Sequence, residues 1–293
     1  MSFEKAYENF KIYASSRHKK QGFDTIVQNF ELHILPYFKN KKLSELKKID
    51  IINWQTEILQ KNFSNNFNRS LYYNFSAFMQ YCVYCSYLDS NLVLQVEKFK
   101  RKHEIKEHHV YTLFQFLKFR FCIQDSIIRE YFTFIYFYGT RPSESMALRF
   151  SDLEPRYKYV HINHSIHRHG KREIDTPKNQ SSIRTLKLGF FMRFKIWQLK
   201  RFYSKKYGNG IDYFIFGGTS PLSPTTIDRR KKVACNKARL FEITQHEFRH
   251  SYATRMIHKK VPIDKVSRDL GHSTVSMTVD VYLHPIKKNT RYF

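Results

Sequence analysis

The stretch TQHEFRHSY, residues 244–252, combines a helix start with side chains that can bind an anion. Thr244 and Glu247 form a capping-box pattern, in which each side chain accepts a hydrogen bond from the other residue's backbone N–H. His246 and Arg249 are three residues apart and therefore share one face in the first turn of the predicted helix. Backbone N–H groups and the helix dipole favour an anion at this end, and we expect that anion to be a phosphate.

The segment GTRPSE, residues 139–144, places an arginine between two predicted helices. Gly139 can end a long aromatic helix, and Pro142 can begin the next one. A guanidinium at this junction can bind a phosphate through two parallel hydrogen bonds. We therefore expect Arg141 to bind phosphate and Glu144 to hold it in position.

The segment LGHST, residues 270–274, lies close to a tyrosine near the end of the sequence. Gly271 is expected to end one helix, and Ser273 to cap the next. His272 precedes Tyr282 by ten residues. Each of the three segments is unspecific alone, and only their combination is informative.

The set G-x-R-x-x-E, H-x-x-R-H, L-G-H and a final tyrosine, in this order and spacing, resembles the tyrosine recombinase (phage integrase) family. The resemblance covers residues 112–293 closely, as the catalytic domain. It covers residues 1–100 more loosely, as a DNA-binding (core-binding) domain with a SAM-like helical arrangement. The implied fold is mainly α with a small antiparallel β-sheet: a SAM-like helical domain plus a mixed α+β catalytic domain. Residues 101–111 are expected to form a basic interdomain linker.

Six positions of this sequence match the catalytic residues of the family: Arg141, Lys178, His246, Arg249, His272 and Tyr282. The resemblance implies that the two arginines clamp the scissile phosphate and that the tyrosine is the nucleophile. Two fixed guanidiniums would oppose the charge that builds on the non-bridging oxygens. A tyrosine hydroxyl has a pKa of about 10 and needs a proton acceptor, for which His246 is the candidate.

The lysine is assigned through the segment TPKNQSSIR, residues 176–184, which resembles the hairpin that bears the catalytic lysine in the family. This resemblance indicates Lys178 as the general acid for the leaving hydroxyl. Lys171 and Lys187 are the alternatives and fit the pattern less well.

Two other tyrosines compete with Tyr282 for the role of nucleophile. Tyr252 lies within the helix that carries H-x-x-R and is expected to be a core residue. Tyr292 is nearly terminal. The position of Tyr282 relative to His272 favours Tyr282.

The resemblance implies a site-specific recombinase or integrase that cleaves and rejoins DNA through a 3′-phosphotyrosine and a Holliday junction. The expected partners are double-stranded DNA with specific recombination sites, a homotetramer on paired sites, and accessory DNA-bending proteins. Integration of a mobile genetic element or a viral genome would be its role. The sequence has no G-x-x-x-x-G-K-[ST] loop and no acidic cluster typical of a metal-dependent nuclease, so we expect no cofactor and no metal.

Three alternatives remain open at this point. The first is a chromosome or plasmid resolution recombinase of the Xer type, and the second is strand passage resembling that of type IB topoisomerases. The third is a DNA-binding regulator with an inactive site, against which the six matching residues argue. Many integrases that resemble this chain carry an additional N-terminal arm-binding domain, and the sequence begins directly at the expected core-binding domain.

The charge of the chain favours nucleic acid as a partner. Lys and Arg number 51 against 25 Asp and Glu, which gives a formal net charge of +26. Such a surplus strains a compact fold unless a polyanion neutralises it. We find neither a leader nor a run of 18 apolar residues, and therefore expect a cytoplasmic protein, nucleoid-associated when bound to DNA, without a membrane partner.

Apolar side chains at helical spacing predict helices in residues 3–93, with stripes of Phe23, Val27, Phe30 and Ile34, then Ile51, Trp54 and Ile58, then Leu71, Phe75, Phe78 and Cys82. Cys82 and Cys85 form a lone C-x-x-C, which we interpret as part of a packed helix rather than a metal or redox site.

The second half of the chain alternates predicted helices with one short β region. Thr112 and Gln115 form a capping box, and a helix is expected from about Asp125 to Gly139. Strands are expected within residues 157–188, with a turn at Gly170. Ser223 and Pro224 open a further helix, whose basic turn at residues 229–232 is either a solvated face or a surface against DNA.

Overall fold

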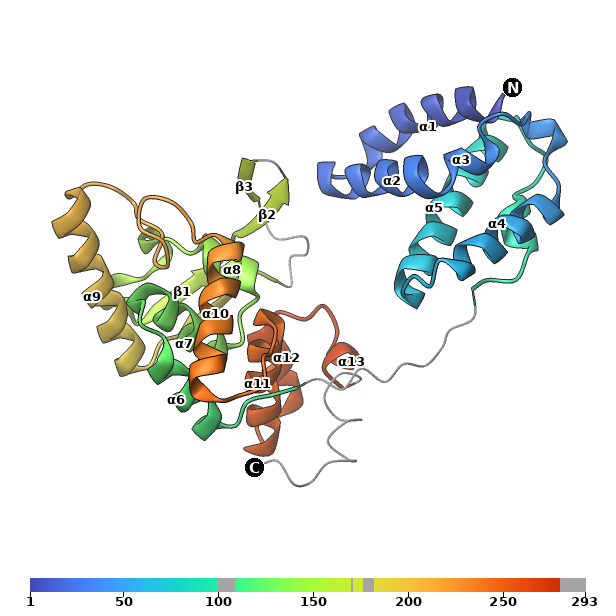
Figure 1. Ribbon diagram of the computed structural model, residues 1–293. Helices are drawn as coiled ribbons and strands as arrows, with labels where there is room; N and C mark the ends of the chain where they lie inside the picture. Colours follow the sequence, from blue (N-terminus) through green and yellow to red (C-terminus); the bar gives the residue numbers. More distant parts are fainter. Residues whose placement is uncertain (100–108, 170, 176–181, 280–293) are drawn as a thin grey trace. The chain divides into compact units, whose positions relative to one another are not determined.

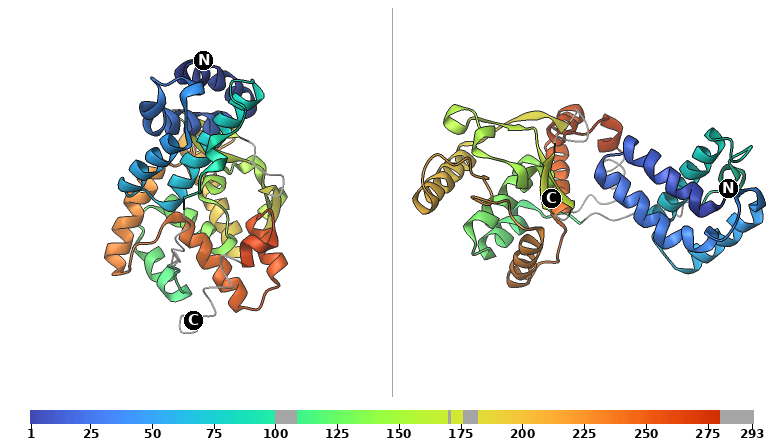
Figure 2. Two further views of the ribbon diagram at one scale, coloured as in Figure 1. Left: turned by 90° about the vertical axis from the view of Figure 1, so that its right-hand side faces the viewer. Right: turned by 90° about the horizontal axis from the view of Figure 1, so that it is seen from above.

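The computed structural model divides into two compact units, Met1–Ile105 and Lys106–Phe293. It describes residues 1–99, 109–169, 171–175 and 182–279. Helices dominate both units, as Figures 1 and 2 show. Among the described residues, no helix is both long enough and apolar enough to cross a bilayer.

The first unit is entirely helical in its described part: α1 (Phe3–Arg17), α2 (Lys20–His33), α3 (Leu35–Phe38), α4 (Lys48–Gln60) and α5 (Asn65–Tyr84), with single 3₁₀ turns at η1 (Leu43–Glu45) and η2 (Leu92–Gln95). Its core consists largely of aromatic rings. Tyr7 stacks on Phe30 with 4.7 Å between ring centroids, and Phe78 lies 4.8 Å from Phe3. Most residues of the helical stripes predicted from the sequence therefore lie in one core, which also buries Cys82 as a free thiol.

The second unit contains the helices α6 (Leu113–Cys122), α7 (Ser126–Tyr138), α8 (Pro142–Ala147), α9 (Phe190–Tyr207), α10 (Pro224–Ala238), α11 (Gln245–His258), α12 (Ile263–Leu270) and α13 (Val275–Thr278). Short 3₁₀ turns follow α8 at η3 (Phe150–Asp152) and η4 (Pro155–Tyr157). Four strands complete it: β1 (Tyr159–Ile162), β2 (Ser165–His169), β3 (Lys171–Asp175) and β4 (Arg184–Lys187). The predicted fold class is confirmed: the chain is mainly helical, with a small antiparallel β component.

The described strands form two antiparallel pairs. β1 pairs with β4, and Tyr159 lies opposite Lys187 while Ile162 lies opposite Arg184. β2 and β3 form a hairpin on either side of the position predicted as a turn, where His169 lies opposite Lys171.

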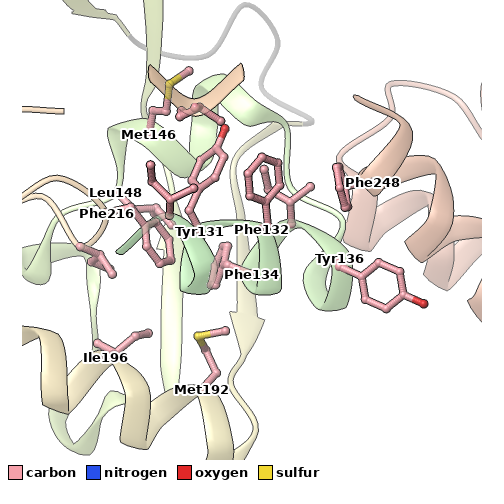
Figure 3. Packing of buried hydrophobic residues seen from close by; sticks show 14 of the residues in the cluster. Tyr131, Phe132, Phe134, Tyr136, Met146, Leu148, Met192, Ile196, Phe216 and Phe248 are labelled. Carbon is pink, nitrogen blue, oxygen red and sulfur yellow. The ribbon is translucent and has the colours of Figure 1, made fainter. Parts of the chain in front are cut away.

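Helix α7 lies at the centre of the second unit. Its N-cap is Asp125, whose carboxylate accepts hydrogen bonds from the backbone N–H of Ile127 and Ile128 at 2.9 and 3.2 Å. It ends at Gly139, which has a left-handed conformation. Figure 3 shows the α7 side chains packed between α9 below and Phe248 of α11 at one end.

The local start and stop signals read from the sequence are confirmed at most positions. The capping boxes of Thr112 with Gln115 and of Thr244 with Glu247 are both formed. Ser223 is the N-cap of α10, although its side chain makes no capping hydrogen bond. The predicted cap at Ser273 is wrong: α13 begins one residue later, with Thr274 at the N-cap.

The structure describes one of the two basic segments in full and the other only at its end. Of the basic turn at residues 229–232, Lys231 is buried and pairs with Glu242 at 3.2 Å and Asp228 at 3.6 Å, while its three basic neighbours are exposed. Only three of the four cations therefore remain available to a partner. The expected linker, residues 101–111, lies mostly outside the described residues, and its last residue, Tyr111, is fully buried in the second unit.

Candidate active site

Arg141 lies at the junction of α7 and α8, where the sequence predicted it. Gly139 ends α7 at a φ of +66°, Pro142 begins α8, and Arg141 is the N-cap between them. The Arg141 Nη1 donates to Glu144 Oε1 at 2.7 Å and to Ser182 Oγ at 3.2 Å. Its backbone N–H donates to Glu144 Oε2 at 2.8 Å. These neighbours hold the side chain in place, and 29% of its surface remains exposed.

Arg184 is a third arginine of this site that the sequence analysis did not single out. It lies on β4, and its Nη2 donates to Glu144 Oε2 at 2.8 Å. Its Nε donates to the carbonyl oxygen of Asp269 at 2.7 Å. The signal in the sequence is the alternation of the strand, which places Arg184 on the same face as the buried Leu186. A charged residue on a buried face indicates a buried partner, which here is Glu144.

The carboxylate of Glu144 is charged despite its burial. Burial alone would raise the pKa of Glu144, but Arg184, Arg141 and Arg249 together lower it below its ordinary value. Because a buried charge is stable only when it is paired and hydrogen-bonded, the two adjacent guanidiniums and this carboxylate form one unit.

Arg249 reaches the same place from α11. It is 5% exposed, and its Nη1 donates to the carbonyl oxygen of Gly139 at 3.0 Å. This bond links α11 to Gly139, the C-cap of α7. The expected proximity of the two arginines follows from it, since Gly139 and Arg141 are two residues apart.

His272 follows Gly271, the C-cap of α12. Arg141 Nη2 donates to the carbonyl oxygen of Gly271 at 2.8 Å, which brings His272 to the arginine cluster. His272 Nδ1 lies 2.8 Å from Thr278 Oγ1. Burial, followed by the charges of Arg249 and Arg141, lowers the pKa of His272 to about 4. Its imidazole is therefore neutral at neutral pH.

His246 lies in the first turn of α11, as predicted. Burial lowers its pKa, and the nearby Arg249 and Arg141 lower it further. A neutral imidazole can accept a proton, whereas an imidazolium cannot. The same charges that attract an anion therefore keep His246 in the form that can act as a base.

Two glycines of this site allow close approach of other groups. A Cβ on Gly139 would lie 2.4 Å from the Tyr252 ring, and one on Gly271 would lie 2.8 Å from Arg184 Nη1. Both glycines also have positive φ values, +66° and +67°. Their positions thus require glycine for conformation and for space.

The structure brings four of the six predicted residues together: Arg141, His246, Arg249 and His272. Lys178 and Tyr282 lie outside the described residues, as does the rival Tyr292. Tyr252 is buried, as predicted, and its hydroxyl donates to Asp269 Oδ2 at 2.9 Å. Of the alternative lysines, Lys187 is exposed at the end of β4.

The arrangement is suited to binding a phosphate. Three guanidiniums surround one carboxylate, which leaves an excess of positive charge. Their side chains are oriented in advance by a carboxylate and by backbone carbonyls, so they need not reorganise when a ligand binds. Within the described part of the chain, no cluster of three or more His, Cys, Asp or Glu residues is arranged to hold a metal.

Two family models match the sequence. The model described as "Phage integrase family" matches residues 103–289. The model described as "Phage integrase, N-terminal SAM-like domain" matches residues 2–59.

Curated relatives have similar names. The ICEBs1 integrase of Bacillus subtilis (strain 168) is 24% identical over 261 residues, which cover 86% of this chain and 70% of that protein. A protein named tyrosine recombinase XerC-like, from Caldanaerobacter subterraneus subsp. tengcongensis, is 25% identical over 297 residues, which cover 88% of this chain and 74% of that protein.

Solved structures of integrases share the fold. The Tn1549 transposon integrase in complex with transposon right end DNA has a TM-score of 0.77 at 17% identity, covering 99% of this chain and 100% of that chain. A lambda integrase tetramer bound to a Holliday junction has a TM-score of 0.73 at 16% identity, covering 96% of this chain and 77% of that chain. At these identities the likeness concerns the fold alone.

Proposed function

This chain belongs to the phage integrase family of tyrosine recombinases, and from that premise we propose that it cleaves and rejoins DNA through a covalent phosphotyrosine at Tyr282. The observation that carries the proposal is the cluster of Arg141, Arg184 and Arg249 around Glu144. A fixed group of guanidiniums is suited to the scissile phosphate, whose non-bridging oxygens gain charge as the nucleophile attacks.

In the proposed cleavage step, the Tyr282 oxygen attacks the phosphorus and the bond to the 5′ oxygen breaks. The tyrosine proton passes to His246, whose lowered pKa keeps it unprotonated and ready to accept. Lys178 supplies a proton to the departing 5′ oxygen, which leaves as a hydroxyl. The product is a 3′-phosphotyrosine, and attack by another 5′ hydroxyl reverses the step without an external energy source.

Arg141 and Arg249 are proposed to contact the phosphate directly. Arg141 retains an exposed part of its side chain, and both residues lie beside histidines whose pKa values they lower. His272 is proposed to hydrogen-bond a non-bridging oxygen. Its Nδ1 contact to Thr278 supports this role, because it orients the other ring nitrogen.

The proposed substrate is double-stranded DNA with specific recombination sites. The net charge of +26 supports a polyanionic partner. The solved structures with the same fold include integrases bound to DNA and a tetramer on a Holliday junction. We propose the same kind of assembly here, with residues 1–100 as the core-binding domain and residues 112–293 as the catalytic domain.

A nicked duplex that carries the chain's own recombination site tests the proposal. Cleavage close to the nick releases a short strand that diffuses away, so the covalent intermediate accumulates. The wild-type chain should form a denaturation-resistant adduct, and Tyr282→Phe should form none. If the wild type forms no adduct on its own site, the enzymatic function is wrong and a regulatory DNA-binding role gains support.

A second measurement distinguishes the proposed recombinase from a type IB topoisomerase. A topoisomerase relaxes supercoiled plasmid that has no recombination site, whereas the proposed recombinase joins strands between two sites. Relaxation without exchange between paired sites would favour the alternative. Exchange between sites on one replicon would favour resolution of the Xer type over integration.

A further inference from the structure

Helix α9 exposes large aromatic side chains along its length, and two of them, Phe194 and Trp197, stack with 5.8 Å between ring centroids. Six of them are between 40% and 81% exposed, and together they define the α9 face: Phe190, Phe191, Phe194, Trp197, Phe202 and Tyr207. Large apolar groups on a surface are often part of an interaction site when they are contiguous.

The aliphatic residues of α9 point in the other direction. Met192, Ile196 and Leu199 are buried, together with Tyr203, and form the side that packs on the core. Figure 3 shows Met192 and Ile196 directed toward the α7 side chains. The large apolar groups of the exposed side are therefore all aromatic, and the core does not account for them.

Cations interleave with these rings. The helix carries Arg193, Lys195, Lys200, Arg201, Lys205 and Lys206 and no acidic residue. The Arg201 guanidinium lies 4.9 Å from the Trp197 ring centroid, and the Lys206 ammonium lies 5.0 Å from that of Tyr207. Among the described residues, none of the six cations forms an ion pair with a carboxylate.

A hollow of about 320 Å³ opens beside Trp197. It is lined by Tyr157, Trp197, Lys200, Arg201 and Ser204. The hollow thus combines two aromatic rings, two cations and a hydroxyl, which suit a flat ring and an adjacent anion.

We propose that the α9 face binds single-stranded nucleic acid, with bases stacked on the exposed rings and phosphates paired with the cations. Stacking on aromatic side chains along a positively charged surface is the usual way in which such strands are bound. A duplex hides its base faces and would leave the rings unused. A helix lying on a lipid surface keeps its rings on one face and its cations on the opposite face, whereas on α9 Arg201 lies beside the Trp197 ring and Lys206 beside the Tyr207 ring.

The α9 face is separate from the candidate active site. Helix α7 lies between α9 and α11, as the buried side chains in Figure 3 show. Binding at α9 can therefore be tested independently of strand cleavage, and failure of one does not imply failure of the other.

The chain contains a reporter for this test. Its two tryptophans are Trp54, which is buried in the first unit, and Trp197 on α9. The full-length chain is titrated with an oligothymidylate of about 12 nucleotides while tryptophan emission is followed. The difference between the wild type and Trp197→Phe isolates the Trp197 signal. We expect saturable quenching of that signal, and much weaker quenching by a duplex of the same length.

Two further variants show whether stacking is involved. Phe194→Ala should weaken oligothymidylate binding about tenfold, because one ring–base stack is lost. Phe114→Ala, at a 77% exposed ring of α6 in the same unit, is the matched control and should leave the affinity unchanged. Phe194→Ala should also leave formation of the covalent adduct intact.

Several outcomes would overturn the proposal. These are an absence of quenching, equal affinity of Phe194→Ala and wild type, and equal quenching by heparin, a polyanion without bases. A blue shift of Trp197 emission with phosphatidylserine vesicles, without any response to oligothymidylate, would instead identify a membrane-binding surface.

Discussion

Glu144 Oε2 and Arg184 Nη2 lie 2.8 Å apart, and the two side chains are only 2% and 8% exposed. This ion pair connects α8 with β4 across 40 residues of sequence. The same carboxylate also receives Arg141, so one buried anion fixes two guanidiniums. The orientation of Arg141 thus depends on a strand that the motif GTRPSE does not contain.

Replacing Glu144 by Gln should strongly destabilise the second unit. The substitution leaves two guanidiniums close together without their carboxylate, and loss of one partner of a buried ion pair costs about 3–5 kcal/mol. Urea unfolding followed by circular dichroism measures the free energy of unfolding. Glu154→Gln, at a 41% exposed side chain of the same unit, is the control and should change that free energy by less than about 1 kcal/mol. Equal effects of the two substitutions would contradict the assigned role of Glu144.

Gly139→Ala should lower the free energy of unfolding by at least about 2 kcal/mol, because the new methyl group overlaps the Tyr252 ring and the backbone has a positive φ. Gly189→Ala is the matched control, since Gly189 has a φ of −69° and its added Cβ would lie 3.6 Å from the Tyr138 hydroxyl. It should cost about 1 kcal/mol or less. A well-folded Gly139→Ala variant of wild-type stability would show that the close approach is not required.

His272 should titrate near pH 4 in the free protein, well below its ordinary pKa of 6.5. Because the unfolded chain takes up this proton at a higher pH than the folded chain, the residue favours folding above about pH 6.5. That contribution is lost as the pH falls toward 4. NMR of the imidazole, assigned with His272→Gln, measures the value. Bound DNA should raise the pKa, since a phosphate offsets the arginine charges, and a midpoint of 6.5 in the free protein would contradict the described environment.

Tyr252→Phe should show that Tyr252 has a structural role in the core, distinct from the catalytic role proposed for Tyr282. The Tyr252 hydroxyl donates to Asp269, and its removal should cost about 1 kcal/mol of stability. Covalent adduct formation should persist, because the residue packs in the core. Loss of the adduct in a stably folded Tyr252→Phe variant would assign this tyrosine a part in the chemistry.

Local signals made most helix boundaries of the second unit predictable. Capping at Thr112 and Thr244 and the left-handed glycine at Gly139 depend only on neighbouring residues, so short stretches of sequence contain them. The prediction of a cap at Ser273 failed because two adjacent residues, Ser273 and Thr274, are both typical N-caps, and the sequence alone does not decide between them.

Contacts between distant segments could not be predicted in the same way. Arg184 pairs with a residue 40 positions earlier, and Lys231 turns inward to Glu242 although its neighbours are exposed. The sequence predicted which residue types would gather at the site, because the family motifs specify them. It predicted that Glu144 would hold Arg141, but it did not predict that Arg184 shares this carboxylate, because that contact depends on how β4 packs against α8.

The identity of the nucleophile is the central claim, and peptide mapping of the trapped protein–DNA adduct tests it most directly. The adduct formed on a nicked recombination site is digested with a protease and a nuclease, and mass spectrometry locates the residue that carries the nucleotide. We predict the modification on Tyr282 in the wild-type chain and its absence in Tyr282→Phe. A nucleotide attached to Tyr252, to Tyr292 or to a residue other than tyrosine would contradict the account.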